Sequence, residues 1–383
     1  SHIGSLDDVV CPPYDVISEE ERLALMQRSP YNVVRLELPR DESGGDAYGG
    51  AARLLDSWRD GGVLHRDAAP AFYGHRMAFR DPSGAPRSTV GVIGALGLEP
   101  PGQGILPHEE TTPKAKSDRL HLIRSTRANL SPIWALTPTR GLADLCDPPT
   151  RPVEHSTSDD RVTHELWPII EPGRVRAIGE LVGSQAVLIA DGHHRYETAL
   201  AYQAERRDDG EPPGGPDAIM TLVVELDEGQ LSVQAIHRLV SGLPAGFDLV
   251  AALQGAFDLS PTAPLDTTIG RRMLDAGALA LLTRDGTWLA RPRAETVQAA
   301  SHDLDSSRLD VALAGLPAHE LTYQHGWASC AAAVANGYAD AAVLLRPADV
   351  EQIASISRGG VRMPPKTTFF WPKPRTGLVL REL

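Results

Sequence analysis

One short segment of the sequence combines side chains that suit the binding of a phosphate group. Residues 191–195, Asp-Gly-His-His-Arg (the DGHHR box), follow the apolar run 186–190 and precede the amphipathic run 196–207 without a spare residue. This order predicts a strand, a tight turn and a helix. The backbone N–H groups at the start of that helix, together with its dipole, would then favour an anion at the turn.

Each residue of the DGHHR box could contribute to binding a phosphate. Gly192 permits a close approach of the backbone to a ligand. His193 and His194 can donate hydrogen bonds, and Arg195 carries a planar fork that matches phosphate. We predict these four residues as the phosphate-binding group, with His194 also as a catalytic residue. Asp191 could hold a magnesium ion, orient a histidine or cap the helix, and we predict it as catalytic and as the magnesium ligand. The two histidines could instead bind zinc, although adjacent positions lack the i, i+4 spacing of helical zinc ligands.

Lysine is rare in this chain, and its positions are informative. Of the 37 basic residues only four are lysines, and the other 33 are arginines. The lysines fall in two short segments rich in Pro and Thr, at Lys114, Lys116, Lys366 and Lys373. A compact ammonium group is not interchangeable with the arginine fork at a tight anion site. We therefore expect both segments to bind the anionic donor beside the DGHHR box, the alternative being chance clustering.

Transfer of a phosphoryl group also needs a carboxylate that orients the attacking hydroxyl. Glu37 is a lone acid in the apolar, β-branched run 32–38, which we expect to be a strand. We predict Glu37 as the catalytic carboxylate, with Arg35 on the same face of that strand. Asp15, after a Pro-Pro-Tyr turn, is the second candidate. For both acids the alternative is a solvent-exposed position without a catalytic role.

A second polar segment begins at His108 and Glu109 and runs to Lys116, directly before a predicted helix. It places an acid, a base and a cation within a few residues of one another. It is not an HExxH zinc motif, because residue 112 is threonine. The alternative interpretation is a solvated, charged loop.

Several blocks along the chain resemble known proteins. The DGHHR box resembles the phosphate-binding motif of the ParB/sulfiredoxin-like fold, including the free-serine kinases built on it. The chain as a whole resembles the domain-of-unknown-function 1015 family. The matching blocks lie at 12–17 (PPYDVI), 32–37 (NVVRLE), 108–109 with 116–119, 191–199 (DGHHRYETA), 237–238 (HR) and 363–373 (MPPKTTFFWPK).

This resemblance implies a fold, an activity and a set of substrate contacts. The fold would be a mixed α/β protein with a ParB/sulfiredoxin-like phosphate-binding core. Some relatives phosphorylate free L-serine, so the resemblance implies ATP, ADP or pyrophosphate as the phosphoryl donor, with Mg²⁺ as cofactor. It also implies substrate contacts from Tyr14, Asp15, Asn32, Arg35, His108 and Glu109. Phe369 and Trp371 stand where the family has tyrosines, which bears on the identity of the acceptor.

The composition excludes several classes of protein. Fifty acidic residues against 37 basic ones leave a net charge of −13, which disfavours nucleic acid as a partner. No apolar run approaches the ~20 residues that span a bilayer, and no signal peptide opens the chain. Three scattered cysteines exclude a disulfide framework. We expect a cytoplasmic protein that binds a small molecule, with no nucleic acid and no membrane as partners; its oligomeric state stays open, a homodimer included.

The remaining patterns predict the elements that position these residues in an α/β (mixed α+β) fold. We expect an N-terminal α/β region at 6–145, the phosphate-binding core at 160–242 and a C-terminal α/β region at 243–383. One predicted helix begins at residue 19 after a capping Ser18, and others span 46–58, with Asp46 as candidate N-cap, 117–125, 172–182 and 196–207. Predicted strands span 32–38, 71–79, 89–98, 132–136, 164–170, 186–190 and 219–226. A hairpin turn is predicted at 81–84, between the strands 71–79 and 89–98, and a linker at 137–160.

These observations together favour a small-molecule phosphotransferase that acts on the hydroxyl of free L-serine or a similar acceptor. Two alternatives stay open. One is a non-catalytic, ParB-like module that binds a nucleotide and switches a partner. The other is a metal-dependent enzyme that uses His193 and His194.

Overall fold

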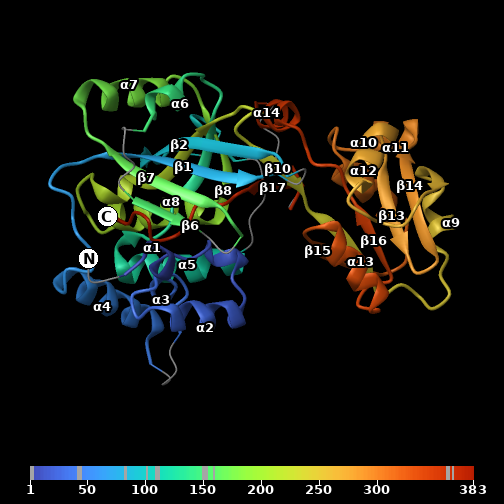
Figure 1. Ribbon diagram of the computed structural model, residues 1–383, viewed down its shortest axis with the longest axis horizontal. Coiled ribbons are helices and arrows are strands. Elements are labelled where there is room, and N and C mark those ends of the chain that lie inside the picture. The colour runs from blue at the N-terminus through green and yellow to red at the C-terminus, as the bar shows by residue number, and fades with distance from the viewer. Residues whose placement is uncertain are drawn as a thin grey trace. The chain divides into compact units, whose positions relative to one another are not determined.

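The protein forms two compact units with mixed α/β structure, which confirms the predicted fold class (Figure 1). The computed structural model describes residues 4–40, 45–81, 84–100, 102–107, 113–148, 154–157, 160–358, 363–364 and 366–383, without the side chains of 113–116 and 357–358. The first unit contains Ser1–Pro107, Thr111–Ser232 and Pro372–Leu383, and the second contains Val233–Trp371. Most of the regions 6–145 and 160–242 therefore lies in the first unit, up to Ser232, and residues 233–242 belong to the second. The last residues of the chain, Pro372–Leu383, also join the first unit.

An eight-stranded sheet forms the centre of the first unit. Its strand order is β3-β8-β5-β9-β2-β1-β7-β6, and the pairs β3–β8 and β5–β9 are parallel while the others are antiparallel. The strands are β1 (Phe72–Arg80), β2 (Pro86–Gly97), β3 (Ile105–Pro107), β5 (Ile133–Thr137), β6 (Glu154–Thr157), β7 (Thr163–Ile169), β8 (Val187–Asp191) and β9 (Ala218–Glu225). A two-stranded sheet pairs β4 (Ala128–Asn129) with β18 (Arg381–Glu382) and so fixes the end of the chain to this unit.

Strands β1 and β2 form the hairpin that the sequence predicts. They pair in antiparallel register from Tyr73 opposite Ile93 to Arg80 opposite Pro86. At the turn, the N–H of Gly84 donates to the carbonyl of Asp81 at 2.8 Å, and Gly84 has a φ of +86° that favours glycine.

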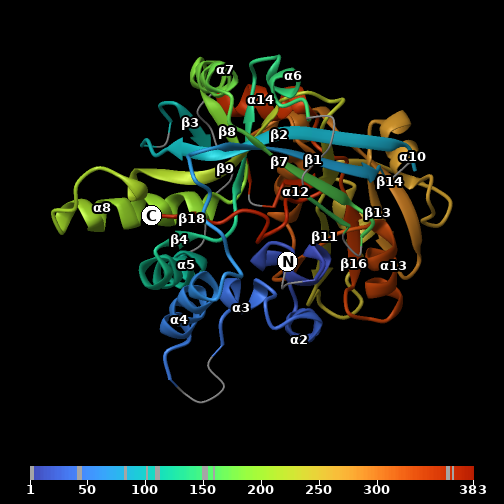
Figure 2. The same ribbon diagram turned by 60° about the vertical axis from the view of Figure 1, so that its left-hand side comes forward.

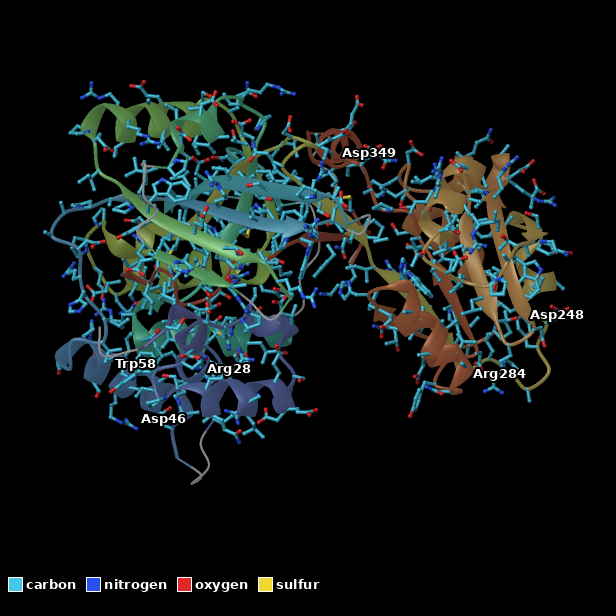
Figure 3. The ribbon with its side chains drawn as sticks, in the orientation of Figure 1. Arg28, Asp46, Trp58, Asp248, Arg284 and Asp349 are labelled. Carbon is cyan, nitrogen blue, oxygen red and sulfur yellow. The ribbon has the colours of Figure 1, made fainter. Side chains whose placement is uncertain are left out.

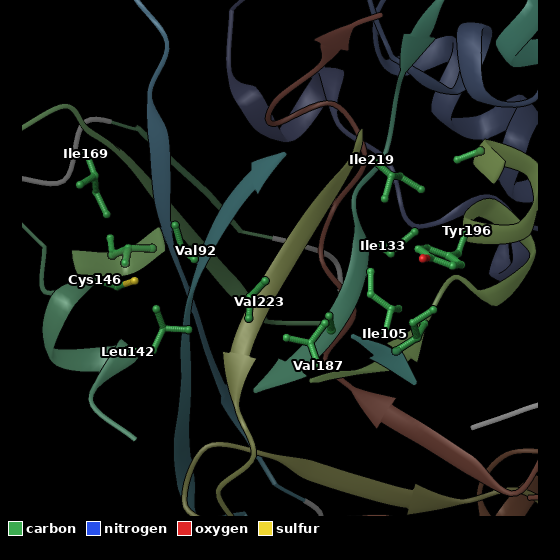
Figure 4. Close-up of a cluster of buried hydrophobic side chains, with 14 of the residues drawn as sticks. Val92, Ile105, Ile133, Leu142, Cys146, Ile169, Val187, Tyr196, Ile219 and Val223 are labelled. Carbon is green, nitrogen blue, oxygen red and sulfur yellow. The ribbon is translucent and has the colours of Figure 1, made fainter. Parts of the chain in front are cut away.

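One face of the sheet carries the core that supports the DGHHR box (Figure 4). The members of this core lie an even number of positions apart along each strand, such as Val187 and Ile189 of β8 or Ile219 and Val223 of β9, as period-2 structure requires. Ile178, Tyr196 and Ala199 pack onto this cluster from two helices, α7 (Pro172–Gly183) and α8 (His193–Asp208), beside Leu142 of α6 (Leu142–Leu145). Full burial of each large side chain contributes about 1.5–3 kcal/mol. The core therefore fixes α8 against the sheet.

The N-terminal part of the first unit is helical. Its helices are α1 (Leu6–Val9), the 3₁₀ turn η1 (Tyr14–Val16), α2 (Glu19–Arg28), α3 (Val34–Glu37), α4 (Ala47–Asp60) and α5 (Pro113–Thr126). Ser18 caps α2, and Asp46, which is labelled in Figure 3, caps α4. Their side chains accept backbone N–H groups at 3.2 and 2.9 Å, as their residue types predict. In both ribbon views α6 and α7 lie on the side of the sheet away from α2–α5 (Figures 1 and 2).

The prediction of a strand at residues 32–38 is wrong, because the structure places the short helix α3 there. The side chain of Asn32 accepts the N–H of Val34 at 3.0 Å and donates to the carbonyls of Asp8 and Val10 at 2.8 and 3.2 Å. These contacts start the helical turn. Asn32, Val33, Val34, Leu36 and Glu37 are all buried, so tertiary burial outweighs the β propensity of the run.

Two further boundaries differ from the sequence prediction. Helix α5 begins at Pro113 rather than at residue 117, and proline is favoured at a first helical position. Helix α8 begins at His193 rather than at residue 196, so the basic part of the DGHHR box is its first turn. The expected linker 137–160 contains α6 and β6.

The second unit is built on a six-stranded antiparallel sheet with the order β12-β14-β13-β16-β11-β15. Helices α9 and α12 pack on one face, and α10 and α13 on the other. Asp248, labelled in Figure 3, caps α9 by accepting the N–H of Ala251.

The strands are β11 (His237–Ser241), β12 (Phe257–Pro261), β13 (Leu279–Thr283), β14 (Gly286–Pro292), β15 (Glu320–Gln324) and β16 (Ala341–Leu344), with β10 (Ser232–Ala235) paired to β17 (Thr368–Trp371) in a separate sheet. The helices are α9 (Leu249–Leu253), α10 (Ile269–Ala276), α11 (Ala294–Ala299), α12 (Asp305–Leu313), α13 (Trp327–Ala335) and α14 (Val350–Arg358), and the first unit also holds the 3₁₀ turn η2 (Gly215–Asp217).

Within the described part of the chain, no helix is long and apolar enough to cross a bilayer.

Candidate functional site: a buried ionic network at the start of α8

The DGHHR box adopts the strand–turn–helix geometry that the sequence predicts. Asp191 is the last residue of β8, Gly192 forms the turn, and His193 begins α8. Gly192 has φ +95° and ψ 27°, a left-handed conformation. A Cβ added there would lie 2.8 Å from the Cγ2 of Ile133 and 3.1 Å from Nη2 of Arg195. Only glycine therefore fits this turn, which places the N-terminus of a 16-residue helix at the end of β8.

Asp191 is the centre of an ionic cluster. Its Oδ1 accepts a hydrogen bond from the Nζ of Lys373, and its Oδ2 accepts one from Nη2 of Arg195 at 2.7 Å. The Nζ of Lys373 also lies 3.4 Å from Oδ2 of Asp15. Burial alone raises the pKa of Asp191, but the charges of Lys373 and Arg195 outweigh burial and hold that pKa well below its usual range.

Lys373 is held in its charged form by the same contacts. Burial lowers the pKa of Lys373, whereas the carboxylates of Asp191 and Asp15 raise it, and the net pKa lies above the usual value. The lysine side chain is only 10% exposed. The contact joins residues 182 positions apart, as expected if lysines converge on the DGHHR box.

Arg195 is turned toward the protein. Its Nη1 donates to the carbonyl of Pro132 at 2.7 Å and to the hydroxyl of Ser131 at 3.1 Å, while Nη2 contacts Asp191. Its Nε is buried without a hydrogen-bond partner among the described residues. The fork that we expected to bind phosphate is therefore largely occupied by the chain. The geometry makes Arg195 a residue that positions Asp191 and Ser131.

Glu37 lies behind this cluster and not on a solvent-exposed strand. Its side chain is 2% exposed, and its Oε1 accepts the hydroxyl proton of Ser131 at 3.1 Å and lies 3.5 Å from Nη1 of Arg119. Arg119 also donates to the backbone carbonyl of Glu37 at 2.9 Å. Within the described residues, no group donates a hydrogen bond to Oε2. One oxygen of Glu37, Oε1, is therefore fixed by its contacts with the chain.

Ser131 connects the two ends of the network. An arginine only donates and an ionised carboxylate only accepts, whereas a hydroxyl does both. The hydroxyl of Ser131 must therefore accept a hydrogen bond from Arg195 and donate one to Glu37, so its proton points toward Oε1 of Glu37. The predicted catalytic carboxylate is thus joined to the DGHHR box through one side chain.

Tyr14 contacts both arginines of the network. Its ring centroid is 4.3 Å from the guanidinium carbon of Arg119 and 5.9 Å from that of Arg195. Burial raises the pKa of the Tyr14 hydroxyl, with the charges of Arg195 and Arg119 opposing that effect. The aromatic ring attracts both cations, which helps to keep the guanidinium groups in place.

Sequence reasoning missed two members of this network, Ser131 and Arg119. Neither carried a role in the sequence prediction, although Arg119 falls in a block shared with the family. The signal for Ser131 is weak, since a serine before Pro132 and a strand is common. Its role becomes visible only when residues 94 positions apart come together at 3.1 Å.

The other predicted site residues fall into four groups. Asn32 and Arg35 have structural partners, because Asn32 forms the contacts that start α3 and Nη2 of Arg35 donates to the carbonyl of Met26 at 2.7 Å. His193 is buried and His194 is partly exposed in the first turn of α8. Lys366 belongs to the second unit. Outside the described residues lie His108 and Glu109 and the side chains of Lys114 and Lys116.

The donor set at Asp191 does not fit a magnesium ion. Both carboxylate oxygens already bind cations, Lys373 on Oδ1 and Arg195 on Oδ2. Nowhere in the described part of the chain do three or more His, Cys, Asp or Glu side chains form a group that could hold a metal. Magnesium prefers carboxylate oxygens that are free to coordinate it. No step in the proposed chemistry is therefore assigned to a metal held by Asp191.

A cleft of about 500 Å³ lies elsewhere in the first unit, between α7 and the sheet. Phe72, Ile178 and Val187 line it, and no basic side chain of the described residues does. A phosphate would find no counter-charge there. Tyr196, which follows the DGHHR box, contacts the wall of this cleft, because its hydroxyl donates to the carbonyl of the lining residue Glu99 at 2.6 Å.

The fold and the network define a mixed α/β protein with a basic strand–turn–helix site backed by a buried carboxylate. A family model described as "Protein of unknown function (DUF1015)" matches residues 2–312. The match covers most of the chain, so the protein belongs to this family.

Three solved structures are similar to this chain at a distance. One is a free serine kinase in complex with AMP, at 14% identity over 73% of this chain and 86% of that chain, with a TM-score of 0.38. Another is a conserved hypothetical protein from Pyrococcus furiosus, at 15% identity over 73% and 90%, with a TM-score of 0.36. The third is SbnI with a C-terminal truncation from Staphylococcus aureus, at 14% identity over 74% and 84%, with a TM-score of 0.40. The comparison with curated proteins finds no significant match.

Proposed function

We propose that the first unit transfers a phosphoryl group from ATP, ADP or pyrophosphate to the hydroxyl of a small acceptor, such as free L-serine. The observation that carries this proposal is the continuous path of contacts from Glu37 through Ser131 and Arg195 to Asp191 and the start of α8. That path joins a buried carboxylate to an anion-binding helix terminus. Phosphoryl transfer needs these two groups at a fixed spacing.

The donor phosphates bind at the N-terminus of α8 in this proposal. The turn at Gly192 permits close backbone approach, and the positive end of the 16-residue helix favours an anion. His193, His194 and Lys373 supply the donors and the positive charge beside it. Lys114 and Lys116 of the first unit are kept as further proposed donor-binding residues.

The acceptor is proposed to bind with its hydroxyl at Oε2 of Glu37. The hydroxyl oxygen forms a bond to the transferred phosphorus, the bond from that phosphorus to the bridging oxygen of the donor breaks, and the hydroxyl proton passes to Glu37. Asp15, whose side chain is 34% exposed, offers a negative charge beside Lys373. Such a charge suits the ammonium group of a free amino acid, which supports L-serine over a neutral alcohol.

The test is a screen of donors against acceptors. ATP, ADP and pyrophosphate are each incubated with pooled L-amino acids and sugars, and phosphorylated products are read by mass spectrometry. We expect one phosphorylated hydroxy compound from one of the donors. Glu37→Gln should lower its rate of formation at least about 100-fold while donor binding is kept, the usual scale for an acid–base group. Glu205→Gln, a matched change on the exposed surface of α8, should leave the rate unchanged.

The same screen separates the alternatives. Tight nucleotide binding without any product would favour the non-catalytic ParB-like switch. A product whose formation survives Glu37→Gln but is lost on replacing His193 or His194 and on chelation of metal would favour the metal-dependent enzyme.

A further inference from the structure

Lys373 occupies the position that a divalent cation would take in this site. Its ammonium nitrogen contacts Asp191 and Asp15, two carboxylates that come from distant parts of the chain. Such bridging of carboxylates by one cation is the arrangement that magnesium or manganese forms in other proteins. We propose that the ammonium group of Lys373 is the resident cation here and excludes divalent metal ions from the free protein.

Electrostatics supports this assignment. Asp191 carries one negative charge, and Lys373 and Arg195 together bring two positive charges to it, both on side chains about nine-tenths buried. A dication that approached Oδ1 would have to displace the ammonium group and would still face the guanidinium 2.7 Å from Oδ2. Because this repulsion acts in a desolvated site, it is only weakly screened by water.

The proposal makes a specific claim about the protein without Lys373. The carboxylates of Asp191 and Asp15 then lose the cation that both contact. One oxygen of each faces the place that the ammonium nitrogen had occupied. Carboxylate oxygens are the ligands that Mn²⁺ and Mg²⁺ prefer. We expect removal of the lysine to create an affinity for a divalent ion that the wild-type site lacks. The claim concerns the free protein, so it holds or fails independently of phosphoryl transfer.

The test uses Mn²⁺ alone as the probe, followed by electron paramagnetic resonance of the free ion. We compare the wild-type full-length chain with Lys373→Met, which removes the charge and keeps most of the side-chain volume. We expect Lys373→Met to bind one more equivalent of Mn²⁺ than the wild type. The double variant Lys373→Met/Asp191→Asn should lose that additional equivalent, because its central ligand is gone.

A matched control separates this effect from the general negative charge of the protein. Arg207→Met removes a cation from the surface of α8, where Arg207 contacts Asp217 at 2.8 Å. That variant should bind Mn²⁺ as the wild type does. Circular dichroism establishes that each variant is folded, and Lys373→Ala replaces Lys373→Met if the latter is not.

Two results would overturn the proposal. One is a wild-type protein whose Mn²⁺ binding disappears with Asp191→Asn, because the site would then hold a metal beside Lys373. The other is a folded Lys373 variant that gains no Mn²⁺. Either result would leave the donor–acceptor screen of the proposed function unaffected.

Discussion

We expect the protein to lose stability in mild acid, because two histidines are buried in the sheet of the first unit. His75 of β1 and His164 of β7 are 1% and 2% exposed, and Nε2 of His75 lies 3.3 Å from Nδ1 of His164. Burial lowers the pKa of His75 to about 4. Burial also lowers the pKa of His164, and the positive charges of His75 and Arg375 lower it further. Both rings are therefore neutral in the folded protein at neutral pH.

The sign and size of the effect follow from proton linkage. The unfolded chain binds a proton on histidine near pH 6.5, whereas folded His75 does so only near pH 4, so the unfolded state binds more protons between these values. Stability is therefore lost as the pH falls through this window. A difference of about 2.5 pKa units corresponds to about 3 kcal/mol, of which roughly 2 kcal/mol is lost between pH 7 and pH 5.

The assay is urea unfolding of the wild type and His75→Leu at pH 7, 6 and 5, followed by circular dichroism. His75→Leu should weaken the pH dependence by roughly 2 kcal/mol over this range. It should also cost about 1 kcal/mol at pH 7, because His164 loses its partner. His65→Leu, at an exposed position, is the control and should keep the wild-type pH dependence. An unchanged pH dependence in His75→Leu would show that the pair does not govern acid stability.

Three further predictions concern the site. Ser131→Ala should reduce the rate of product formation by roughly 10-fold or more at unchanged donor affinity, and Ser131→Thr should restore much of it because the hydroxyl is kept; equal rates in both variants would exclude a positioning role. Gly192→Ala should destabilise the protein by about 1–3 kcal/mol and weaken phosphate binding, since a Cβ would meet Ile133 in a left-handed turn; an unchanged melting temperature would contradict this. Asn32→Ala should cost about 2–3 kcal/mol in urea unfolding yet leave the KM for the acceptor unchanged, and a raised KM with normal stability would return Asn32 to the substrate site.

The sequence predicts those elements whose local signals agree with their tertiary environment. The helix caps at Ser18 and Asp46 and the β1–β2 hairpin are read correctly, because capping and turn chemistry act over a few residues. Residues 32–38 are read wrongly, because their β-branched pattern describes a half-buried strand while the fold buries five of the seven residues. That burial is set by distant segments, which a local pattern does not contain.

The same limit applies to the site. Gly192 and Asp191 are identified from their neighbours in the chain, since the strand, the turn and the helix are consecutive. The orientation of Arg195 could not be predicted, because its partners Ser131 and Pro132 lie more than 60 positions away. A guanidinium fork matches a phosphate and a set of protein acceptors equally well. Only the fold decides which of them it meets.

The division of the first unit into separate stretches of chain affects how the protein is made. The ribosome synthesises β8 and α8 first and then Val233–Trp371 of the second unit. Lys373 follows only afterwards, 182 residues after Asp191. Until then Asp191 has Arg195 as its cation and lacks the ammonium group. A chain that ends prematurely within the second unit therefore carries the DGHHR box without its lysine. The nascent protein therefore forms the contact between Lys373 and Asp191 only after nearly all of it has been synthesised, and a chain truncated within the second unit lacks that contact.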